Sequence, residues 1–363
     1  MKPIVIQTPR GPRGIGPGHP VFIVAELSGN HNQDKQRALE LVDAAAEAGA
    51  DAIKLQTYTA DTLTIDSNKP YFQVEVAGPW QGETLYSLYQ KAHTPWAWHG
   101  ELKARAEARG LPLFSSPFDE TAVDFLEQLE VPLYKVASLE IGDVALLRCI
   151  ARTHKPVIIS RGAASIADIE RALATLRGAG ASEVIVLHCV SAYPARPAEM
   201  NLRTIPDIAQ RFAVISGLSD HTLGTTVAIA SVALGAHVIE KHFTLRRADG
   251  GPDAEFSLEP GEFAELVAGV RQASEALGRP SYEARGREAE IQAFRRSLFV
   301  VADVRAGELF GPRNVRAIRP GQGLPPHCLD LVLGKPAACA LERGTPLRLE
   351  HVVGLTAAEA TPA

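Results

Sequence analysis

Long hydrophobic runs are missing from this chain of 363 residues. No apolar stretch approaches the ~18 residues that a membrane-spanning helix requires, and the N-terminal segment lacks the apolar core of a signal peptide. A strong excess of one charge is missing too, since the formal net charge is −5. Together these absences argue against a membrane protein and against a protein that binds nucleic acid.

Cysteine is scarce, and the four residues present form no CxxC pair. This spacing excludes a disulfide framework and a cysteine-rich zinc site, and it predicts reduced thiols in a cytoplasmic protein. The remaining composition is that of a folded protein, with 46% hydrophobic and 22% charged residues. The length suits one large domain followed by a small one. The cysteines are Cys149, Cys189, Cys328 and Cys339.

Short apolar runs alternate with longer amphipathic stretches over the first 280 residues. Helices are expected between the runs, for example at 34–49 and 224–236. Eight strand–helix units in series predict an α/β fold, the (β/α)8 or TIM barrel. An open doubly wound sheet is the alternative, but no GxGxxG turn follows the first run. The predicted strands are 21–27, 51–58, 111–117, 132–138, 156–162, 183–190, 213–220 and 237–243.

A long insertion at 59–95 follows the second predicted strand. Loops of this length in compact domains are functional or form packing arms. The insertion contains Trp80 and runs into Trp96 and Trp98, the only other tryptophans of the chain. We expect these rings to pack against the barrel rather than to stack on a sugar.

The composition changes after the predicted barrel domain, which we assign to residues 1–280. A polar segment at 281–293 is predicted to be a linker. Short β-like runs with frequent Gly and Pro then predict a small β-rich domain at 294–354. The last residues, 355–363, are predicted to be a disordered tail.

Lysine placement suggests chemistry at the C-terminal ends of the strands, where (β/α)8 barrels carry their active sites. The chain has only ten lysines, yet Lys54, Lys135 and Lys241 fall within strands. A buried lysine is costly unless it is paired. These lysines either form a cationic cradle for a phosphate or carboxylate, or make interior salt bridges, and both can hold at once. The candidate bridge partners are Glu26, Glu140 and Glu240.

Two histidines end neighbouring strands, His221 after the seventh and His242 at the close of the eighth. Neutral imidazoles at matched positions can share a divalent ion and leave room for water or substrate. Such an open site favours Mn²⁺ or Mg²⁺ over structural Zn²⁺. Serines at other strand ends predict an anion pocket, although serine is also a common helix cap. These serines are Ser116, Ser138, Ser160 and Ser219.

A series of motifs in this order resembles the family of sialic acid synthases and their nonulosonate relatives. The C-terminal segment resembles the antifreeze-like (SAF) domain of that family. Within the family, the motifs are most similar to the pseudaminic acid synthase branch. The motifs are AELSGNHN (25–32), DAIKLQTY (51–58), FSSPFD (114–119), YKVAS (134–138), LHCVSAYPA (187–195), GLSDHTLG (217–224), VIEKHFTL (238–245), GGPDAEFSLEP (250–260) and RPGQGL (319–324).

The resemblance implies a role for each matching residue. Glu26 is expected to act as the general base, and His221 and His242 to bind the metal. Arg319 is expected to reach the sugar in the partner subunit of a domain-swapped homodimer. The positions expected to hold phosphoenolpyruvate are Lys54, Lys135, Ser116, Ser138, Ser160 and Ser219. The positions expected near the sugar are Gln56, Tyr193 and Asp253.

Two positions depart from the family pattern. Arg161 stands where strand 5 of the family usually carries Thr, so it either adds a contact beside the phosphate or points outward. Ser191 stands where some members carry Asn, so an N-acyl contact cannot be transferred to this position.

The resemblance also implies a reaction, in which phosphoenolpyruvate condenses with an open-chain 2,4-diacetamido-2,4,6-trideoxyhexose of the altrose type. The products are a nine-carbon 2-keto sugar acid and phosphate. The near alternative is a neuraminic or legionaminic acid synthase that uses a mannose-type sugar. The remote alternatives are a Schiff-base aldolase, which borohydride would trap, and a non-catalytic carbohydrate-binding protein, which would release no phosphate.

Overall fold

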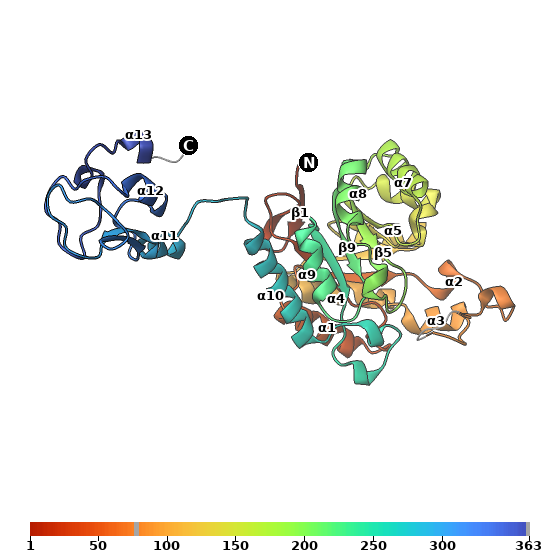
Figure 1. Ribbon diagram of the computed structural model, residues 1–363. Coiled ribbons are helices and arrows are strands. Elements are labelled where there is room, and N and C mark those ends of the chain that lie inside the picture. Colours follow the sequence, from red (N-terminus) through yellow and green to blue (C-terminus); the bar gives the residue numbers. More distant parts are fainter. Residues whose placement is uncertain (76–79, 361–363) are drawn as a thin grey trace. The chain divides into compact units, whose positions relative to one another are not determined.

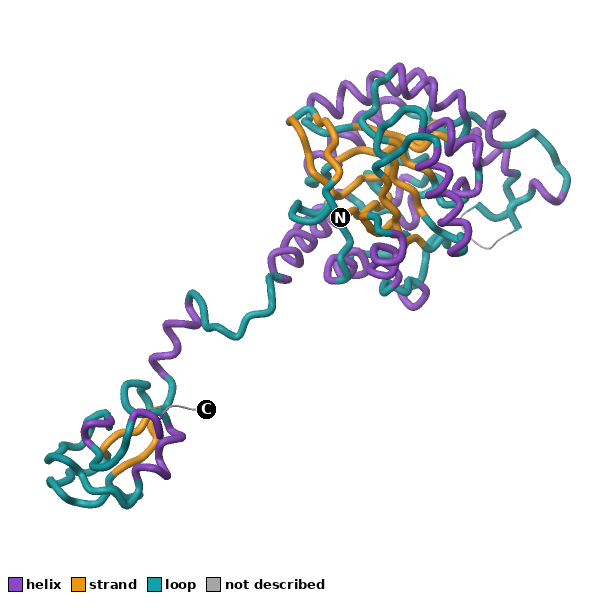
Figure 2. The backbone as a smooth tube through the Cα atoms, turned by 90° about the horizontal axis from the view of Figure 1, so that it is seen from above, coloured by secondary structure: helices purple, strands orange, loops and turns teal. Residues whose placement is uncertain are grey.

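The computed structural model describes residues 1–75 and 80–360. Its central feature is a closed barrel of parallel strands in the order β10-β3-β4-β5-β6-β7-β8-β9, which Figure 2 shows surrounded by helices. The predicted (β/α)8 barrel is confirmed, and each predicted strand contains one observed strand. The strands are β3 (Phe22–Glu26), β4 (Ala52–Thr57), β5 (Leu113–Pro117), β6 (Tyr134–Val136), β7 (Val157–Ser160), β8 (Val184–Cys189), β9 (Ile215–Asp220) and β10 (Val238–His242).

Helices form the outer layer of the barrel unit (Figure 1). Each helix that follows a strand turns one apolar stripe toward the sheet, as in α1, where the buried residues recur at helical spacing. Asp34 begins α1 by accepting hydrogen bonds from the first backbone N–H groups. The helices are α1 (Lys35–Glu47), α4 (His99–Ala108), α5 (Glu120–Gln128), α6 (Val144–Ala151), α7 (Ile166–Gly178), α8 (Thr204–Phe212), α9 (Thr226–Ala233) and α10 (Pro260–Leu277).

A β-hairpin precedes the barrel and was missed at the sequence level. β1 (Ile4–Thr8) and β2 (Gly11–Ile15) pair in antiparallel fashion. Their buried isoleucines belong to the same core cluster as residues of the barrel strands. The frequent Gly and Pro between residues 9 and 20 conceal the short alternating pattern, because these residues normally mark loops.

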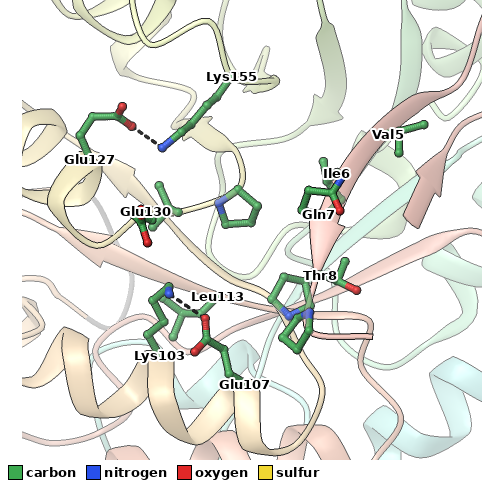
Figure 3. Close-up of a pocket in the computed structure, with 14 residues that line it drawn as sticks. Val5, Ile6, Gln7, Thr8, Lys103, Glu107, Leu113, Glu127, Glu130 and Lys155 are labelled. Atoms are coloured by element: carbon green, nitrogen blue, oxygen red, sulfur yellow. Dashed lines mark hydrogen bonds and ion pairs between the residues drawn. The ribbon is translucent and has the colours of Figure 1, made fainter. Parts of the chain in front are cut away.

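A cavity of about 830 Å³ lies beside this hairpin (Figure 3). Residues that line it directly precede β5, β6 and β7, so the cavity belongs to the N-terminal end of the barrel. Its lysines are neutralised by ion pairs, Lys103 with Glu107 and Lys155 with Glu127, each at 2.6 Å. Among the described residues that line it, none is a predicted site residue. The site residues predicted at the C-terminal ends of the strands therefore lie outside this cavity.

The insertion at 59–95 contains α2 (Ala60–Leu63) and α3 (Leu85–Ala92), while its residues 76–79 lie outside the described residues. Beyond it, Trp96 stacks on Phe125 with ring centroids 4.8 Å apart. Trp98 meets the ring of His31 edge-on at 5.5 Å. These two tryptophans thus make the packing contacts that the sequence predicted.

The chain divides into two compact units, Met1–Gly278 and Arg279–Ala363. In the second, β11 (Ser297–Val300) pairs with β12 (Val315–Ile318), and isolated bridges extend the β structure. This agrees with the predicted small β-rich domain. The helices of this unit are α11 (Arg287–Ile291), α12 (Leu329–Val332) and α13 (Ala357–Ala360).

Helices also occur in the segments predicted to be a linker and a tail. α11 lies within the predicted linker 281–293, and α13 lies within the predicted disordered tail 355–363. Thr356 and Glu359 exchange hydrogen bonds at the start of α13, which stabilises a short turn that composition alone does not reveal. Residues 361–363 of the tail lie outside the described residues.

Candidate active site

Strand geometry decides which side chains point into the barrel, because successive residues of a strand face opposite sides. In β10, Glu240 and His242 therefore share one face, and Lys241 lies on the other. Glu240 contacts lysines on β4 and β6, across the barrel interior. Lys241 instead pairs with Asp220 at 2.8 Å. Of the three strand lysines, Lys241 is thus separated from the other two.

Four buried charges form a chain across the C-terminal end of the barrel. Lys54 Nζ lies 2.5 Å from Glu26 Oε2 and 3.8 Å from Glu240 Oε2. Lys135 Nζ lies 3.6 Å from Glu240 Oε1. The salt-bridge interpretation is therefore correct for Lys54 and Lys135, with two of the three proposed carboxylates as partners.

Hydrogen bonds from strand-end side chains join this chain of charges. Gln56 Nε2 donates to Glu26 Oε1 at 3.0 Å, and Ser219 Oγ donates to Glu240 Oε1 at 3.0 Å. Lys54 Nζ donates to Ser116 Oγ at 3.4 Å. Five of the predicted substrate-binding residues, Lys54, Gln56, Ser116, Lys135 and Ser219, are thus brought into one network.

The two carboxylates of the network differ in basicity. Burial raises the pKa of Glu26, and the single nearby cation, Lys54, only partly opposes this effect. Burial acts in the same direction on Glu240, but Lys135, Lys54 and the Ser219 hydroxyl outweigh it, so its pKa is lowered. Glu26 is therefore the carboxylate better suited to accept a proton.

The two lysines of the network, Lys54 and Lys135, also differ in the direction in which their pKa is shifted. Burial alone would lower the pKa of Lys54, but the carboxylates of Glu240 and Glu26 outweigh it and raise that pKa. The pKa of Lys135 is lowered, because burial prevails over its one close carboxylate partner, Glu240. An additional anion beside Lys135 would stabilise its charged form.

His221 and His242 face each other at the ends of β9 and β10, with ring centroids 5.3 Å apart. His221 Nδ1 donates to the Val190 carbonyl at 2.9 Å, and His242 Nδ1 lies 3.3 Å from Ser28 Oγ. The predicted pairing of the two imidazoles is therefore present. Among the described residues, no group of three or more His, Cys, Asp or Glu side chains is arranged to hold a metal ion.

Protonation differs between these imidazoles. Burial lowers the pKa of His242 well below its usual value, and the neighbouring His221 adds to the effect. Burial also disfavours the charged form of His221, but the Cys189 side chain, with Sγ 3.8 Å from Nδ1, the Val190 carbonyl and Asp220 together outweigh it and raise that pKa. Protonation is therefore less favourable at His242 than at His221.

Aromatic rings enclose the imidazole pair. Tyr193 lies 4.4 Å from the His221 ring, and Phe256 lies 4.9 Å from the His242 ring. Trp80 packs against Tyr193 at 5.1 Å and donates from Nε1 to the Pro252 carbonyl at 2.7 Å. Trp80 thus differs from the other two tryptophans, because it contacts a predicted site residue. Phe256 was not identified from the sequence, where nothing distinguishes it from a core residue.

The remaining strand-end serines are Ser138, which follows β6, and Ser160, which ends β7. Ser138 Oγ is 2.8 Å from Ser191 Oγ. A Cβ on Gly162 would lie 2.3 Å from Ser138 Cβ, so the backbone after β7 approaches these hydroxyls closely. Ser160 Oγ is buried without a hydrogen-bond partner among the described residues. A buried hydroxyl of this kind suits a polar ligand.

Arg161 points away from the serines toward β8. Its Nε donates to His188 Nδ1 at 3.2 Å, and its Nη1 contacts the Ala164 carbonyl at 3.5 Å. His188 Nε2 in turn donates to the Met200 carbonyl. The arginine that replaces the usual Thr thus connects the end of β7 to the loop after β8.

Asp253 and Arg319 are the predicted sugar-side residues outside the strands. Asp253 is buried, and its Oδ2 lies 3.8 Å from His242 Nδ1. Burial raises the pKa of Asp253. Arg319 directly follows β12 in the second compact unit, Arg279–Ala363.

Comparisons with known proteins match both units. The model of the NeuB family matches residues 41–282, and that of the SAF domain matches residues 295–353. A pseudaminic acid synthase from Helicobacter pylori is 41% identical over 334 residues, covering 92% of this chain and 98% of that protein. An N,N'-diacetyllegionaminic acid synthase from Campylobacter jejuni is 35% identical over 318 residues, covering 86% of this chain and 95% of that protein.

A solved structure is similar as well. The N-acetylneuraminic acid synthetase from Leptospira borgpetersenii, crystallised with citrate, superposes with a TM-score of 0.68 at 34% identity. The match covers 76% of this chain and 92% of that chain. Relatives of this kind therefore include synthases for several different sugar acids.

Glu140, just beyond β6, provides a test of the buried charges. Burial raises its pKa from 4.5 to about 7. The folded state therefore binds more protons than the unfolded state between these values, so stability falls as the pH rises through this window. We expect Glu140→Gln to remove roughly 2–3 kcal/mol of this decline, measured by urea unfolding at pH 4.5 and pH 8. The control Glu290→Gln, at an exposed position, should show the same fall in the free energy of unfolding between the two pH values as the wild type. An equal fall in Glu140→Gln would contradict the raised pKa of Glu140.

Proposed function

The chain belongs to the NeuB family and is a nonulosonic acid synthase, and from this membership we propose that its sugar substrate is an open-chain 2,4-diacetamido-2,4,6-trideoxyhexose of the altrose type. The enzyme forms a carbon–carbon bond between phosphoenolpyruvate and the sugar aldehyde. The proposed product is pseudaminic acid, a nine-carbon 2-keto sugar acid. The 41% identity to a pseudaminic acid synthase supports this choice of sugar.

The observation that carries the proposal is the buried chain of charges at the strand ends. Phosphoenolpyruvate brings a carboxylate and a phosphate, which need fixed cations and hydroxyl donors in a dry site. Lys54 and Lys135 supply the cations on neighbouring sides of Glu240. We assign the phosphate end to the side of Lys135, where Ser138 and Ser160 lie.

The imidazole pair suits a divalent ion. Nδ1 of each ring contacts a protein oxygen, and contacts of this kind fix the orientation of the ring. Nε2 of each ring is therefore the nitrogen available to a metal. Bound by His221 and His242, Mn²⁺ or Mg²⁺ would supply Lewis-acid chemistry at the aldehyde oxygen. We place the sugar on this side of the site, near Gln56, Tyr193 and Asp253.

The chemistry proposed for Glu26 follows from its raised pKa. C3 of phosphoenolpyruvate bonds to the aldehyde carbon, and water adds to the cationic C2 that develops. Glu26 accepts a proton from this water and stabilises the positive charge. The bond between C2 and the bridging oxygen then breaks, and this oxygen leaves with the phosphate. The oxygen of the attacking water becomes the new ketone oxygen. The two protons of that water end on the sugar hydroxyl and on the phosphate. No bond to the enzyme forms.

We also propose a domain-swapped homodimer, in which Arg319 of one subunit binds the sugar in the barrel of the other. Arginine offers a planar set of donors that suits hydroxyl, acyl or carboxylate oxygens.

The four cysteines are free thiols, which are typical of a reducing compartment, and we place the enzyme in the cytoplasm. The described residues contain no helix that is long and apolar enough to span a membrane.

A sugar panel tests the proposed substrate. Phosphate release from phosphoenolpyruvate is measured with 2,4-diacetamido-2,4,6-trideoxyaltrose, with its mannose-type isomer and with N-acetylmannosamine. We expect the altrose-type sugar to give the highest kcat/KM. A higher value for either mannose-type sugar would reassign the enzyme to the legionaminic or neuraminic branch. No phosphate release with any sugar would reject the synthase.

Lys135→Met tests the anion site, because it keeps much of the side-chain volume and removes the charge. We expect the KM for phosphoenolpyruvate to rise roughly 100-fold while the KM for the sugar changes little. Lys155→Met, in the cavity at the opposite end of the barrel, is the matched control and should leave both constants unchanged. A rise confined to the KM for the sugar would show that Lys135 lies at the sugar end of the site, which would contradict its assignment to the phosphate end.

Mixed dimers test the role of Arg319. Arg319→Ala and His221→Ala proteins should each be inactive, but exchange of their subunits creates a site with an intact barrel and an intact arginine. Activity should recover to roughly a quarter of the wild-type level on random pairing. If exchange is demonstrated by differently tagged subunits and no activity returns, the arginine does not act across the dimer.

A further inference from the structure

We propose that the buried Lys241–Asp220 ion pair is a clamp that positions His221 and His242 and thereby sets the affinity of the site for a divalent ion. The inference rests on the proposed metal site at these histidines. Lys241 and Asp220 are positioning residues in this proposal, because they act through the imidazoles and contact neither substrate nor ion.

The contacts of Lys241 hold the backbone on both sides of His221. Its Nζ lies 2.8 Å from Asp220 Oδ2 and also donates to the Thr222 carbonyl. Asp220 Oδ1 accepts from the Thr222 N–H at 3.0 Å and from the Thr222 hydroxyl at 2.8 Å. His221 is the first residue after β9. These bonds connect Asp220, which precedes His221, to Thr222, which follows it. They therefore keep the backbone at His221 ordered beyond the end of the strand.

The same lysine also fixes the second imidazole. Lys241 directly precedes His242 in β10, and its Cα pairs with that of Asp220 across the parallel ladder. Because neighbouring residues of a strand face opposite sides, the ion pair lies on the outer face of the barrel while His242 faces inward. One ion pair therefore ties together the strand ends that carry both histidines.

Stability alone is a weak reason for such a pair. Both side chains are completely buried, with 0% of each exposed to solvent. The loss of hydration for two such ions offsets much of their attraction, and apolar residues of similar volume often stabilise a fold equally well. A buried ion pair does, however, impose one defined geometry. A metal site requires such a defined geometry, because the distances between the ion and its ligands must hold within about 0.2 Å.

A double variant tests the clamp without leaving an unpaired charge. Asp220→Asn with Lys241→Met removes both charges, and the Asn oxygen can still accept from the Thr222 N–H. Titration of Mn²⁺ into the metal-free full-length protein, followed by the EPR signal of free Mn²⁺, gives the Kd. We expect binding about 10- to 100-fold weaker than in the wild type, the range found when outer contacts of metal ligands are removed, with a Tm close to that of the wild type.

The matched control is Glu127→Gln with Lys155→Met, which removes an ion pair at the N-terminal end of the barrel. It should leave the Kd for Mn²⁺ unchanged. A folded clamp variant with wild-type Mn²⁺ affinity would overturn the proposal and leave the metal site intact. A wild-type protein that binds no Mn²⁺, or a His221→Ala variant that binds it normally, would instead remove the proposed metal site itself.

Thr222→Val provides a second variant if the double variant does not fold. It preserves the ion pair and the side-chain shape but deletes the hydroxyl that orients Asp220. We expect Mn²⁺ affinity to fall about threefold, a smaller effect than for removal of an outer contact altogether. Thr222→Ser, which restores the hydroxyl, should recover wild-type affinity. Equal Kd values for Thr222→Val and the wild type would contradict the clamp.

Discussion

Burial of positive charge at the C-terminal end of the barrel is the constraint on which the rest of the site depends. Lys54 and Lys135 are only 4% and 2% exposed, and an isolated ammonium group in such surroundings would give up its proton. Glu240 and Glu26 outweigh this effect at Lys54, whose pKa is raised, but Glu240 only partly opposes it at Lys135, whose pKa remains lowered. An anionic substrate bound between these groups, as proposed, would raise the pKa of both carboxylates through its own charge. In the proposed mechanism, the same arrangement binds the substrate and prepares Glu26 to accept a proton.

The inner and outer faces of the barrel contribute different residues to the candidate site and to its support. The inner face of β10 contributes Glu240 and His242 to the site, while the outer face contributes Lys241 to the contacts that fix the strand ends. The loops after β8 and β10 then complete one side of the site with Tyr193 and Phe256 around the imidazoles. A rigid sheet thus presents the charged groups, and the loops supply the aromatic surroundings in which the sugar is proposed to bind.

Periodicity was enough to predict the barrel, because buried parallel strands are continuous apolar runs and their polar ends stand out. It missed the β1–β2 hairpin, whose Gly and Pro residues resemble a loop. Strand ends also do not reveal which face a side chain takes, so Lys241 was grouped with Lys54 and Lys135 although it lies on the outer face. The directions of Arg161 and Trp80 depend on tertiary contacts with His188 and Tyr193, which no local pattern encodes.

The fate of the bridging oxygen of phosphoenolpyruvate tests the proposed mechanism most directly. Phosphoenolpyruvate labelled with ¹⁸O at the C2–O–P position is turned over with the altrose-type sugar, and both products are analysed by mass spectrometry. Attack of water on C2, with Glu26 as the base, breaks the C–O bond and predicts that the label leaves in the phosphate. Label retained in the 2-keto group of the sugar acid would mean that water attacks phosphorus, and would contradict the role given to Glu26.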